Sequence, residues 1–228
     1  MPGHPAISPK RAAKLKAKKY REAEGLFLAE GTTLLEEATA TPVHVFDEEA
    51  QILRVSTLET PAGPVGVFPF LDVTVPELLS KVRRIVLLHG VQDPGNVGTA
   101  IRSAHAFGAG VALSRGSADL YNPKTVRASM GSIFHAPVAR ELETVEFLRE
   151  AGNAGFALVA ATPGAGDTPR SLPAGRLVIC IGAEGSGLPD EVVDACEMQV
   201  GIPSVAPSLN ASVAASILLY EAYSRVLP

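Results

Sequence analysis

From residue 84 onward, short apolar runs alternate with segments of helical patterning. The runs are rich in Val, Ile and Leu and cover residues 84–89, 110–114, 156–161, 176–182 and 198–203. The helix-like segments cover residues 96–107, 123–130, 143–151, 188–196 and 209–226. Continuous apolar strands separated by helices are typical of a mostly parallel sheet with helices on both faces. This alternation therefore predicts an α/β fold.

The N-terminal third has a different pattern. Residues 8–40 are helical and then mixed, and residues 41–70 contain the strand-like pieces PVHVF and GPVGVFPF, separated by Pro and Gly. Residues 71–81 have the composition of a linker that leads into a short helix. We expect a small α/β domain over residues 1–76, followed by the parallel-sheet domain over residues 77–228.

Basic residues gather at the N-terminus, although the formal net charge of the chain is −4. Seven of the 20 Lys and Arg residues precede residue 22, where no acidic residue occurs: Lys10, Arg11, Lys14, Lys16, Lys18, Lys19 and Arg21. A basic arm on an acidic body is suited to contact with phosphates, because each neutralised phosphate releases counterions. A solvated basic helix end would have the same composition, so both interpretations stay open.

Composition excludes several classes of protein. Hydrophobic residues make up 46% and charged residues 19% of the chain, which is ordinary for a globular protein. No apolar run approaches the ~20 residues that span a bilayer, and the polar N-terminus does not resemble a signal peptide. We expect a cytoplasmic protein without a membrane partner. Cys180 and Cys196 lack metal-ligand or redox spacing and are expected to be free thiols, and the five scattered histidines offer no metal site.

Three polar clusters follow predicted strands, where open α/β sheets place their ligands. The first lies within HGVQDPGNVGTAIRSAHAFG, residues 89–108. Asn96 stands at the expected N-cap of a helix, and capping alone would explain it. Arg102 lies off the apolar stripe of that helix, so an ordinary surface position would explain it as well.

The second cluster is IGAEGSGLPDEV, in which Gly182, Gly185 and Gly187 surround Glu184. Its spacing, G-x-x-G-x-G, reverses the dinucleotide fingerprint, and a carboxylate there would repel a pyrophosphate. The P-loop lysine is also absent. These features disfavour a nicotinamide-dependent oxidoreductase, although a purely structural turn stays open.

The third cluster, GIPSVAPSLNASVAAS, crowds Ser208, Asn210 and Ser212 at the start of the last helix. One cap needs only one of these side chains, so the surplus suggests a phosphate or another polar ligand. The helix itself is rich in small residues, which permit close approach by the sheet, another helix or another chain.

The three segments NVGTAIR, GAEGSGL and SLNASVA, in this order, resemble the signature motifs of the SpoU (TrmH-type) RNA 2′-O-ribose methyltransferases. The resemblance covers residues 84–228. The segment KYREAEGLFLAEG also resembles the ribosomal-protein-like RNA-binding domain that many members carry in front. The stretch from Glu37 to Leu58 is shorter than in a usual leading domain.

The resemblance implies a C-terminal deep trefoil knot, S-adenosylmethionine as cofactor, and a homodimer with sites near its interface. It implies that RNA is the substrate, with 23S ribosomal RNA favoured over tRNA and DNA not expected. Carried over by position, the cofactor-binding residues are Gly182, Ile202, Ser208 and Leu209, with Ala160 to Thr162 beside them. The polar catalytic set would be Arg102, Asn96, Glu184, Ser208 and Asn210, with Arg102 acting beside the cofactor of the partner subunit.

The implied reaction transfers a methyl group from a sulfonium to a ribose 2′-oxygen, which requires positioning and removal of the hydroxyl proton. Two roles for Arg102 stay open, because a guanidinium ordinarily has no acceptor site. It could act as the base, or it could steer the phosphate and stabilise the developing alkoxide. A non-catalytic RNA-binding module on the same fold is the remaining alternative.

Overall fold

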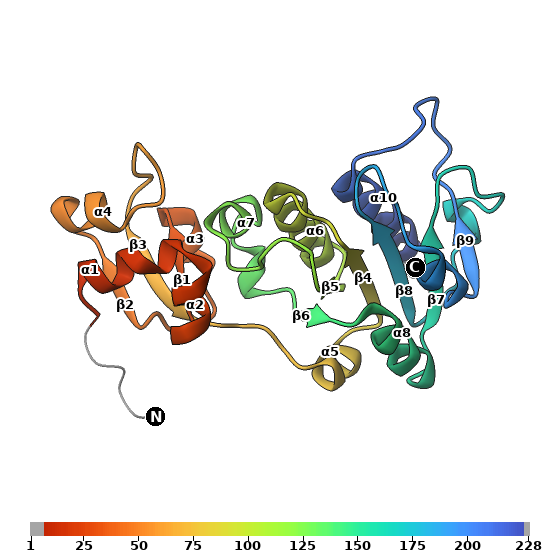
Figure 1. The fold of residues 1–228 in the computed structure, drawn as a ribbon, viewed down its shortest axis with the longest axis horizontal. Helices are drawn as coiled ribbons and strands as arrows, with labels where there is room; N and C mark the ends of the chain where they lie inside the picture. Colours follow the sequence, from red (N-terminus) through yellow and green to blue (C-terminus); the bar gives the residue numbers. More distant parts are fainter. Residues whose placement is uncertain (1–6, 226–228) are drawn as a thin grey trace.

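The computed structural model describes residues 7–225, which form a small domain and a larger one (Figure 1). The small domain holds a three-stranded antiparallel sheet in the order β1-β3-β2. Its elements are α1 (Pro9–Ala12), η1 (Ala13–Lys16), α2 (Lys18–Glu24), β1 (Leu26–Glu30), α3 (Thr32–Glu36), β2 (His44–Phe46), α4 (Glu49–Val55) and β3 (Val65–Pro69). One side of this sheet, which includes Phe46 of β2, packs on Leu15 and Val55.

The larger domain is built on a six-stranded sheet in the order β6-β5-β4-β8-β7-β9, and every strand pair in it is parallel. Its first half contains α5 (Val75–Lys81), β4 (Arg84–His89), α6 (Pro94–Ala106), β5 (Gly110–Ser114), α7 (Pro123–Ala128), η2 (Ser132–Phe134) and β6 (Val138–Leu142). Its second half contains α8 (Thr144–Asn153), β7 (Ala157–Ala161), η3 (Pro169–Ser171), β8 (Leu177–Gly182), α9 (Asp190–Asp194), β9 (Met198–Val200) and α10 (Ala211–Ser224). The predicted parallel α/β sheet is confirmed.

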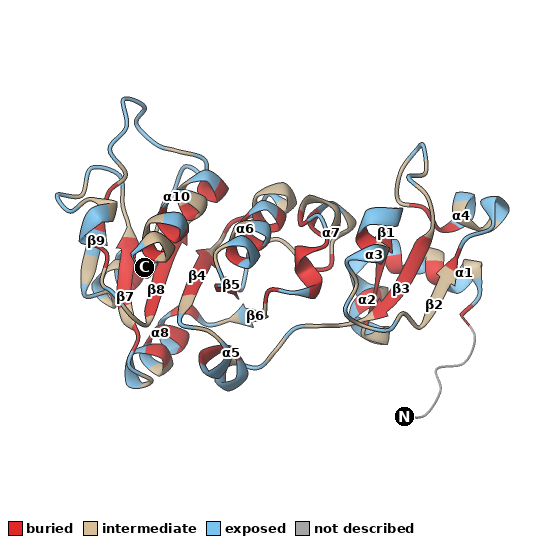
Figure 2. Ribbon diagram, turned by 180° about the vertical axis from the view of Figure 1, so that it is seen from behind, coloured by how far each residue is buried: buried red, intermediate tan, exposed pale blue. Residues whose placement is uncertain are grey.

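Helices cover both faces of this sheet, as the apolar runs predict. Successive strand residues point to opposite faces, so Val86 and Leu88 pack with α6 and α10, while Ile85 and Leu87 pack with α5, α8 and α9. The strands β4, β7 and β8 are buried, whereas the loop that precedes α10 is exposed (Figure 2). Among the described residues, no helix is long and apolar enough to cross a membrane.

The largest differences from the predicted elements concern β6, the last strand and α9. The strand β6 was not predicted, because Pro137 precedes it and the polar residues Arg140 and Glu141 interrupt its apolar pattern. In the structure, Glu141 has a positive φ of 57°. It lies at the edge of the sheet, where a half-polar strand is tolerated. The last strand ends at Val200 rather than residue 203, and α9 is shorter than residues 188–196, with Pro189 as its N-cap. The expected domain boundary, between residues 76 and 77, lies in the first turn of α5.

Aromatic side chains join the two domains in one continuous core. Phe27 and Phe68 of the small sheet pack against Tyr121 and Phe134, with ring centroids 4.8 Å apart in the Phe27–Tyr121 and Phe68–Phe134 pairs. The Tyr121 hydroxyl accepts the backbone N–H groups of Leu71 (2.5 Å) and the next residue (2.7 Å). The small domain is therefore docked against the larger one by buried side chains.

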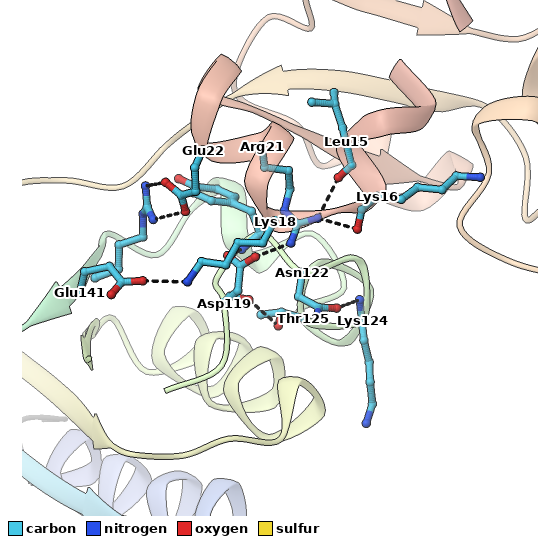
Figure 3. Close-up of polar contacts among 12 residues, drawn as sticks. Leu15, Lys16, Lys18, Arg21, Glu22, Asp119, Asn122, Lys124, Thr125 and Glu141 are labelled. Carbon is cyan, nitrogen blue, oxygen red and sulfur yellow. Dashed lines mark hydrogen bonds and ion pairs between the residues drawn. The ribbon is translucent and has the colours of Figure 1, made fainter. Parts of the chain in front are cut away.

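A buried arginine completes this docking (Figure 3). Nη1 of Arg21 donates to the carbonyls of Leu15 and Lys16, each over 2.8 Å, while its Nη2 pairs with the Asp119 carboxylate. The side chain of Arg21 is only 3% exposed. Arg21 thus belongs to the domain interface, whereas the sequence placed it in a basic surface arm.

Candidate active site

The loop after β4 places Asn96 inside α6, not at its N-cap. Oδ1 of Asp93 accepts the backbone N–H groups of Gly95 (2.7 Å) and Asn96 (3.1 Å), so Asp93 is the capping residue. The interpretation of Asn96 as an N-cap was wrong, because Asp93 precedes a proline that starts the helix at position 94. The Asn96 side chain is therefore available for other contacts.

Three loops that follow β4, β8 and β9 meet in one polar cluster. Nδ2 of Asn96 donates to Oε1 of Glu184 over 2.6 Å, and Nδ2 of Asn210 donates to the same oxygen over 2.7 Å. The same Asn210 amide lies 2.9 Å from Oδ1 of Asn96. The carboxyl ends of parallel strands share one sheet edge, which explains why residues so distant in sequence converge.

Asn210 serves the cluster and the last helix together. Its Oδ1 accepts the backbone N–H groups of Ser212 (3.0 Å) and Val213 (3.2 Å), which makes it the N-cap of α10. Its amide nitrogen is left to bind Glu184. Capping thus fixes the orientation in which the amide donates to the cluster.

Ser212, which the sequence placed in the third polar cluster but not in the catalytic set, also joins these contacts. Its hydroxyl donates to Oδ1 of Asn210 (2.7 Å) and lies 3.3 Å from Oδ1 of Asn96. Its place in the first turn of α10, two residues after the cap, is the signal that could have identified it. Ser208, which was predicted in the catalytic set, is exposed and makes no hydrogen bond to the described residues.

Glycines close the loop that carries Glu184. A Cβ on Gly182 would lie 2.2 Å from the carbonyl carbon of Gly187, and the Gly187 N–H donates to the Ala183 carbonyl over 3.0 Å. The φ values of Gly185 and Gly187, +94° and +69°, are ones that other residues rarely adopt. Close backbone approach within the loop accounts for this glycine spacing.

A cavity of about 610 Å³ lies beside the cluster, at the carboxyl ends of β7, β8 and β9. It is lined by residues from the segments 161–168, 181–187 and 200–214, and many of them are Gly, Ala or Pro. The predicted cofactor residues Gly182, Ile202, Ser208 and Leu209 all line it, together with Ala161, Thr162 and Glu184. Ala160 does not reach the cavity, because it is fully buried inside β7. Small side chains leave backbone groups open to a ligand.

Arg102 stands apart from the cluster. It is exposed on α6, six residues beyond Asn96, which corresponds to about 9 Å along the helix axis and a different face. Its guanidinium makes no hydrogen bond or ion pair with the residues that the structure describes. The single chain therefore unites Asn96, Glu184 and Asn210 without Arg102.

The surface beside Arg102 is formed by α6 and α10, which pack together through a 2.6 Å contact between the hydroxyls of Ser103 and Ser216. On α10, Val213, Ile217 and Tyr220 are 46%, 36% and 57% exposed. Their spacing of four and three residues places them on one face. Arg102 thus stands next to a helix with an uncovered apolar stripe.

The two cysteines lie on the opposite face of the sheet from α6. Both are free thiols, and their Sγ atoms are 3.8 Å apart. The hydrogen bond with Cys196 and complete burial raise the pKa of Cys180 well above its ordinary value. No group of three or more His, Cys, Asp or Glu among residues 7–225 could hold a metal ion.

The chain matches two family models and several characterised proteins. The model of the SpoU rRNA Methylase family matches residues 83–220, and that of the MRM3-like substrate binding domain matches residues 8–47. The 23S rRNA (guanosine(2553)-2′-O)-methyltransferase RlmP of Bacillus subtilis is 32% identical over 91% of this chain and 92% of its own length.

Solved structures agree with this match over nearly the whole chain. The AdoMet-bound rRNA methyltransferase from Sinorhizobium meliloti has a TM-score of 0.87 at 29% identity and covers 96% of this chain and 95% of its own. The SpoU methyltransferase AviRb from Streptomyces viridochromogenes, in complex with AdoMet, has a TM-score of 0.84 at 25% identity, covering 95% and 97%.

Proposed function

The chain belongs to the SpoU rRNA methylase family, and we propose that it methylates a ribose 2′-hydroxyl of 23S ribosomal RNA. It is an S-adenosylmethionine-dependent RNA 2′-O-methyltransferase. The observation that carries the proposal is the convergence of Asn96, Glu184 and Asn210 beside the 610 Å³ cavity. The tRNA ribose is the alternative substrate.

The cavity residues suit the cofactor in size and chemistry. Gly182, at the end of β8, and Ile202 and Leu209, on the segment before α10, line the cavity and would hold the donor chiefly through backbone groups. S-adenosylmethionine supplies an electrophilic methyl group on a sulfonium. Ser208 lines the same wall and would bind the polar part of the donor or the incoming ribose.

The polar cluster would position the acceptor. Oε1 of Glu184 accepts from two amides, so its second oxygen would accept the hydrogen bond of a ribose hydroxyl. Asn96 and Asn210 hold that carboxylate in place. The proton then leaves to the RNA phosphate or to water, while a guanidinium stabilises the developing alkoxide.

That guanidinium would be Arg102 of the partner subunit. The exposed stripe of Val213, Ile217 and Tyr220 on α10 would form the centre of a two-fold homodimer, in which each subunit offers the same surface. Because α6 packs beside α10, such pairing would carry Arg102 to the partner's cavity. A role of Arg102 as the base is the alternative.

The chain path supports a C-terminal knot. After β9, at one edge of the sheet, α10 returns to pack on β8, β4 and α6. The connecting segment 201–210 would thread past the loops after β7 and β8 to form the trefoil. Residues 1–76, with the basic segment, would bind the RNA substrate, and residues 77–228 would catalyse transfer in the cytoplasm.

Methyl transfer with the purified chain tests this function. Radiolabelled S-adenosylmethionine would be incubated with 23S rRNA, tRNA and a DNA of matched sequence, and the product mapped by resistance to alkaline cleavage. We expect label in 23S rRNA at a bond that resists alkali. Label at an alkali-sensitive position would contradict ribose methylation, and absence of both transfer and cofactor binding would indicate a non-catalytic module.

A further inference from the structure

A second cavity, also of about 610 Å³, lies against the polar cluster. It is lined by the loop from His89 to Asp93, by Asn96, and by residues of the 183–189 loop. Ala183, Glu184, Ser186 and Gly187 border this cavity and the first one alike. The two cavities therefore share one wall, and that wall contains the Glu184 carboxylate.

The place of this second cavity in the sheet favours a ligand site. The chain runs from β4 to β5 and β6 on one side, whereas β8, β7 and β9 lie on the other side. The crevice at the carboxyl ends of β4 and β8 is thus the topological switch point, where open parallel sheets bind ligands. The first cavity lies farther along, toward β7 and β9.

We propose that the second cavity binds the nucleotide to be methylated, with Gln92 recognising the edge of its base; this inference rests on the proposed function. Gln92 is exposed in the cavity lining, and its amide makes no hydrogen bond to the described residues. A side-chain amide offers both a donor and an acceptor to a base edge. A nucleoside seated here presents its ribose to the shared wall at Glu184.

His89 and Ser186 frame the rest of the cavity. Nδ1 of His89 is held 2.8 Å from the hydroxyl of Thr144, which orients the imidazole. Ser186 lies on the exposed glycine loop and adds a hydroxyl to the wall. An oriented ring and a hydroxyl are the kinds of group against which proteins place an unstacked base.

Lys124 would bind a flanking phosphate in exchange for its ion pair with Asp93. Its Nζ lies 2.8 Å from Oδ2 of Asp93, the cap of α6, and its side chain is 56% exposed. A phosphate beside Lys124 would stand at the rim of the second cavity, since Asp93 lines that cavity. Exposed lysines contribute to RNA binding through phosphate contact.

The surface beyond Lys124 leads to the basic segment of the small domain. Figure 3 shows Lys124 on the same side of the interface as Asn122 and Asp119, and Asp119 is paired with Arg21. Lys16 of η1 and Lys18 of α2 are also exposed, and the Lys18 side chain points to Glu141, with which it is paired (Figure 3). The RNA strand would therefore run from the second cavity across α7 to η1 and α2.

Two variants test the proposal with the full chain. Gln92→Ala should lower kcat/KM for the natural RNA at least tenfold and abolish discrimination against RNAs with a different base at the methylated position. Lys124→Ala should weaken RNA binding. It should also reduce the slope of log Kd against log salt concentration by about one. The affinity for S-adenosylmethionine, measured by calorimetry, should stay unchanged in both.

Lys81→Ala is the matched control, because Lys81 is exposed on α5, which covers the opposite face of the sheet. It should leave RNA binding and its salt slope as in the parent. Wild-type base discrimination in Gln92→Ala, or a salt slope in Lys124→Ala equal to that of Lys81→Ala, would overturn the proposal. Failure of the proposed function is distinguishable, because then the parent chain itself would methylate no RNA.

Discussion

The side-chain amides of Asn96 and Asn210 lie 2.9 Å apart, although 114 positions separate them in the chain. Both donate to one oxygen of Glu184. Asn210 is also fixed as the cap of α10, and Asn96 is held in the first turn of α6. Three loops thus form a single polar cluster, and Glu184 of that cluster lines both cavities.

Glu184→Gln should lower kcat strongly while it changes the affinity for S-adenosylmethionine little. In the variant, the two amides that now donate to a carboxylate would face an amide nitrogen or a neutral oxygen. Hydrogen bonds to a charged group contribute about 1.5–3 kcal/mol, and the loss of this energy corresponds to a decrease in rate of roughly 10- to 150-fold. Single-turnover methyl transfer is the measurement. Glu191→Gln, exposed in the first turn of α9, is the control, and an unchanged kcat in Glu184→Gln would refute a role for the wall.

Gly182→Ala should abolish cofactor binding. Its Cβ would meet the backbone of Gly187 at 2.2 Å, so the loop that lines the first cavity must move. Gly166→Ala is a matched control, because a Cβ there meets nothing within 4 Å. Calorimetry should detect no S-adenosylmethionine binding by the first variant and parental affinity in the second. Parental affinity in both would place the cofactor elsewhere.

Arg21→Met should destabilise the docked pair of domains. It leaves the Asp119 carboxylate, 10% exposed, without its partner, and breaking such a buried pair costs about 3–5 kcal/mol. Lys18→Met removes an ion pair with Glu141 whose side chains are 52% and 50% exposed, so it should cost less than about 1 kcal/mol. Denaturant unfolding measures the free energy of unfolding of both variants. Equal decreases in the two variants would show that Arg21 does not stabilise the interface.

Folding stability should fall as the pH is lowered below about 6.5. Partial desolvation and the neighbouring His135, whose ring stacks at 4.5 Å, hold the pKa of the exposed His105 below its ordinary value of 6.5. The unfolded chain then binds more protons than the folded one in the window between those two values, so stability is lost as the pH falls through it. Unfolding free energies measured from pH 7.5 to 5 should decline less steeply in His105→Asn. Identical slopes of unfolding free energy against pH for this variant and the parent would contradict a contribution of His105.

The parallel sheet could be predicted from its apolar runs, because strands buried on both faces need continuous Val, Ile and Leu. The meeting of Asn96, Glu184 and Asn210 could also be expected, since parallel strands end at one edge. Other features depend on tertiary neighbours. Arg21 has the sequence context of a surface arm, and only the docked position of Asp119 makes it a buried interface residue.

Local competition explains the remaining differences. Asn96 has the chemistry of an N-cap, but Asp93 together with Pro94 starts the helix one turn earlier. The edge strand β6 is too polar for its pattern to be recognised. Arg102 was expected in the site, but on the single chain it is exposed on α6, and its place in the site depends on the proposed dimer.

The most direct test of the account is methyl transfer by a mixed dimer of Arg102→Ala and Gly182→Ala chains, purified through two different tags. Each homodimer should be inactive, with Arg102→Ala retaining S-adenosylmethionine binding. In the mixed dimer, the intact cavity of the Arg102→Ala chain faces Arg102 of the partner subunit. The account predicts about half the specific activity of the parent dimer, and activity no higher than that of either homodimer would contradict it.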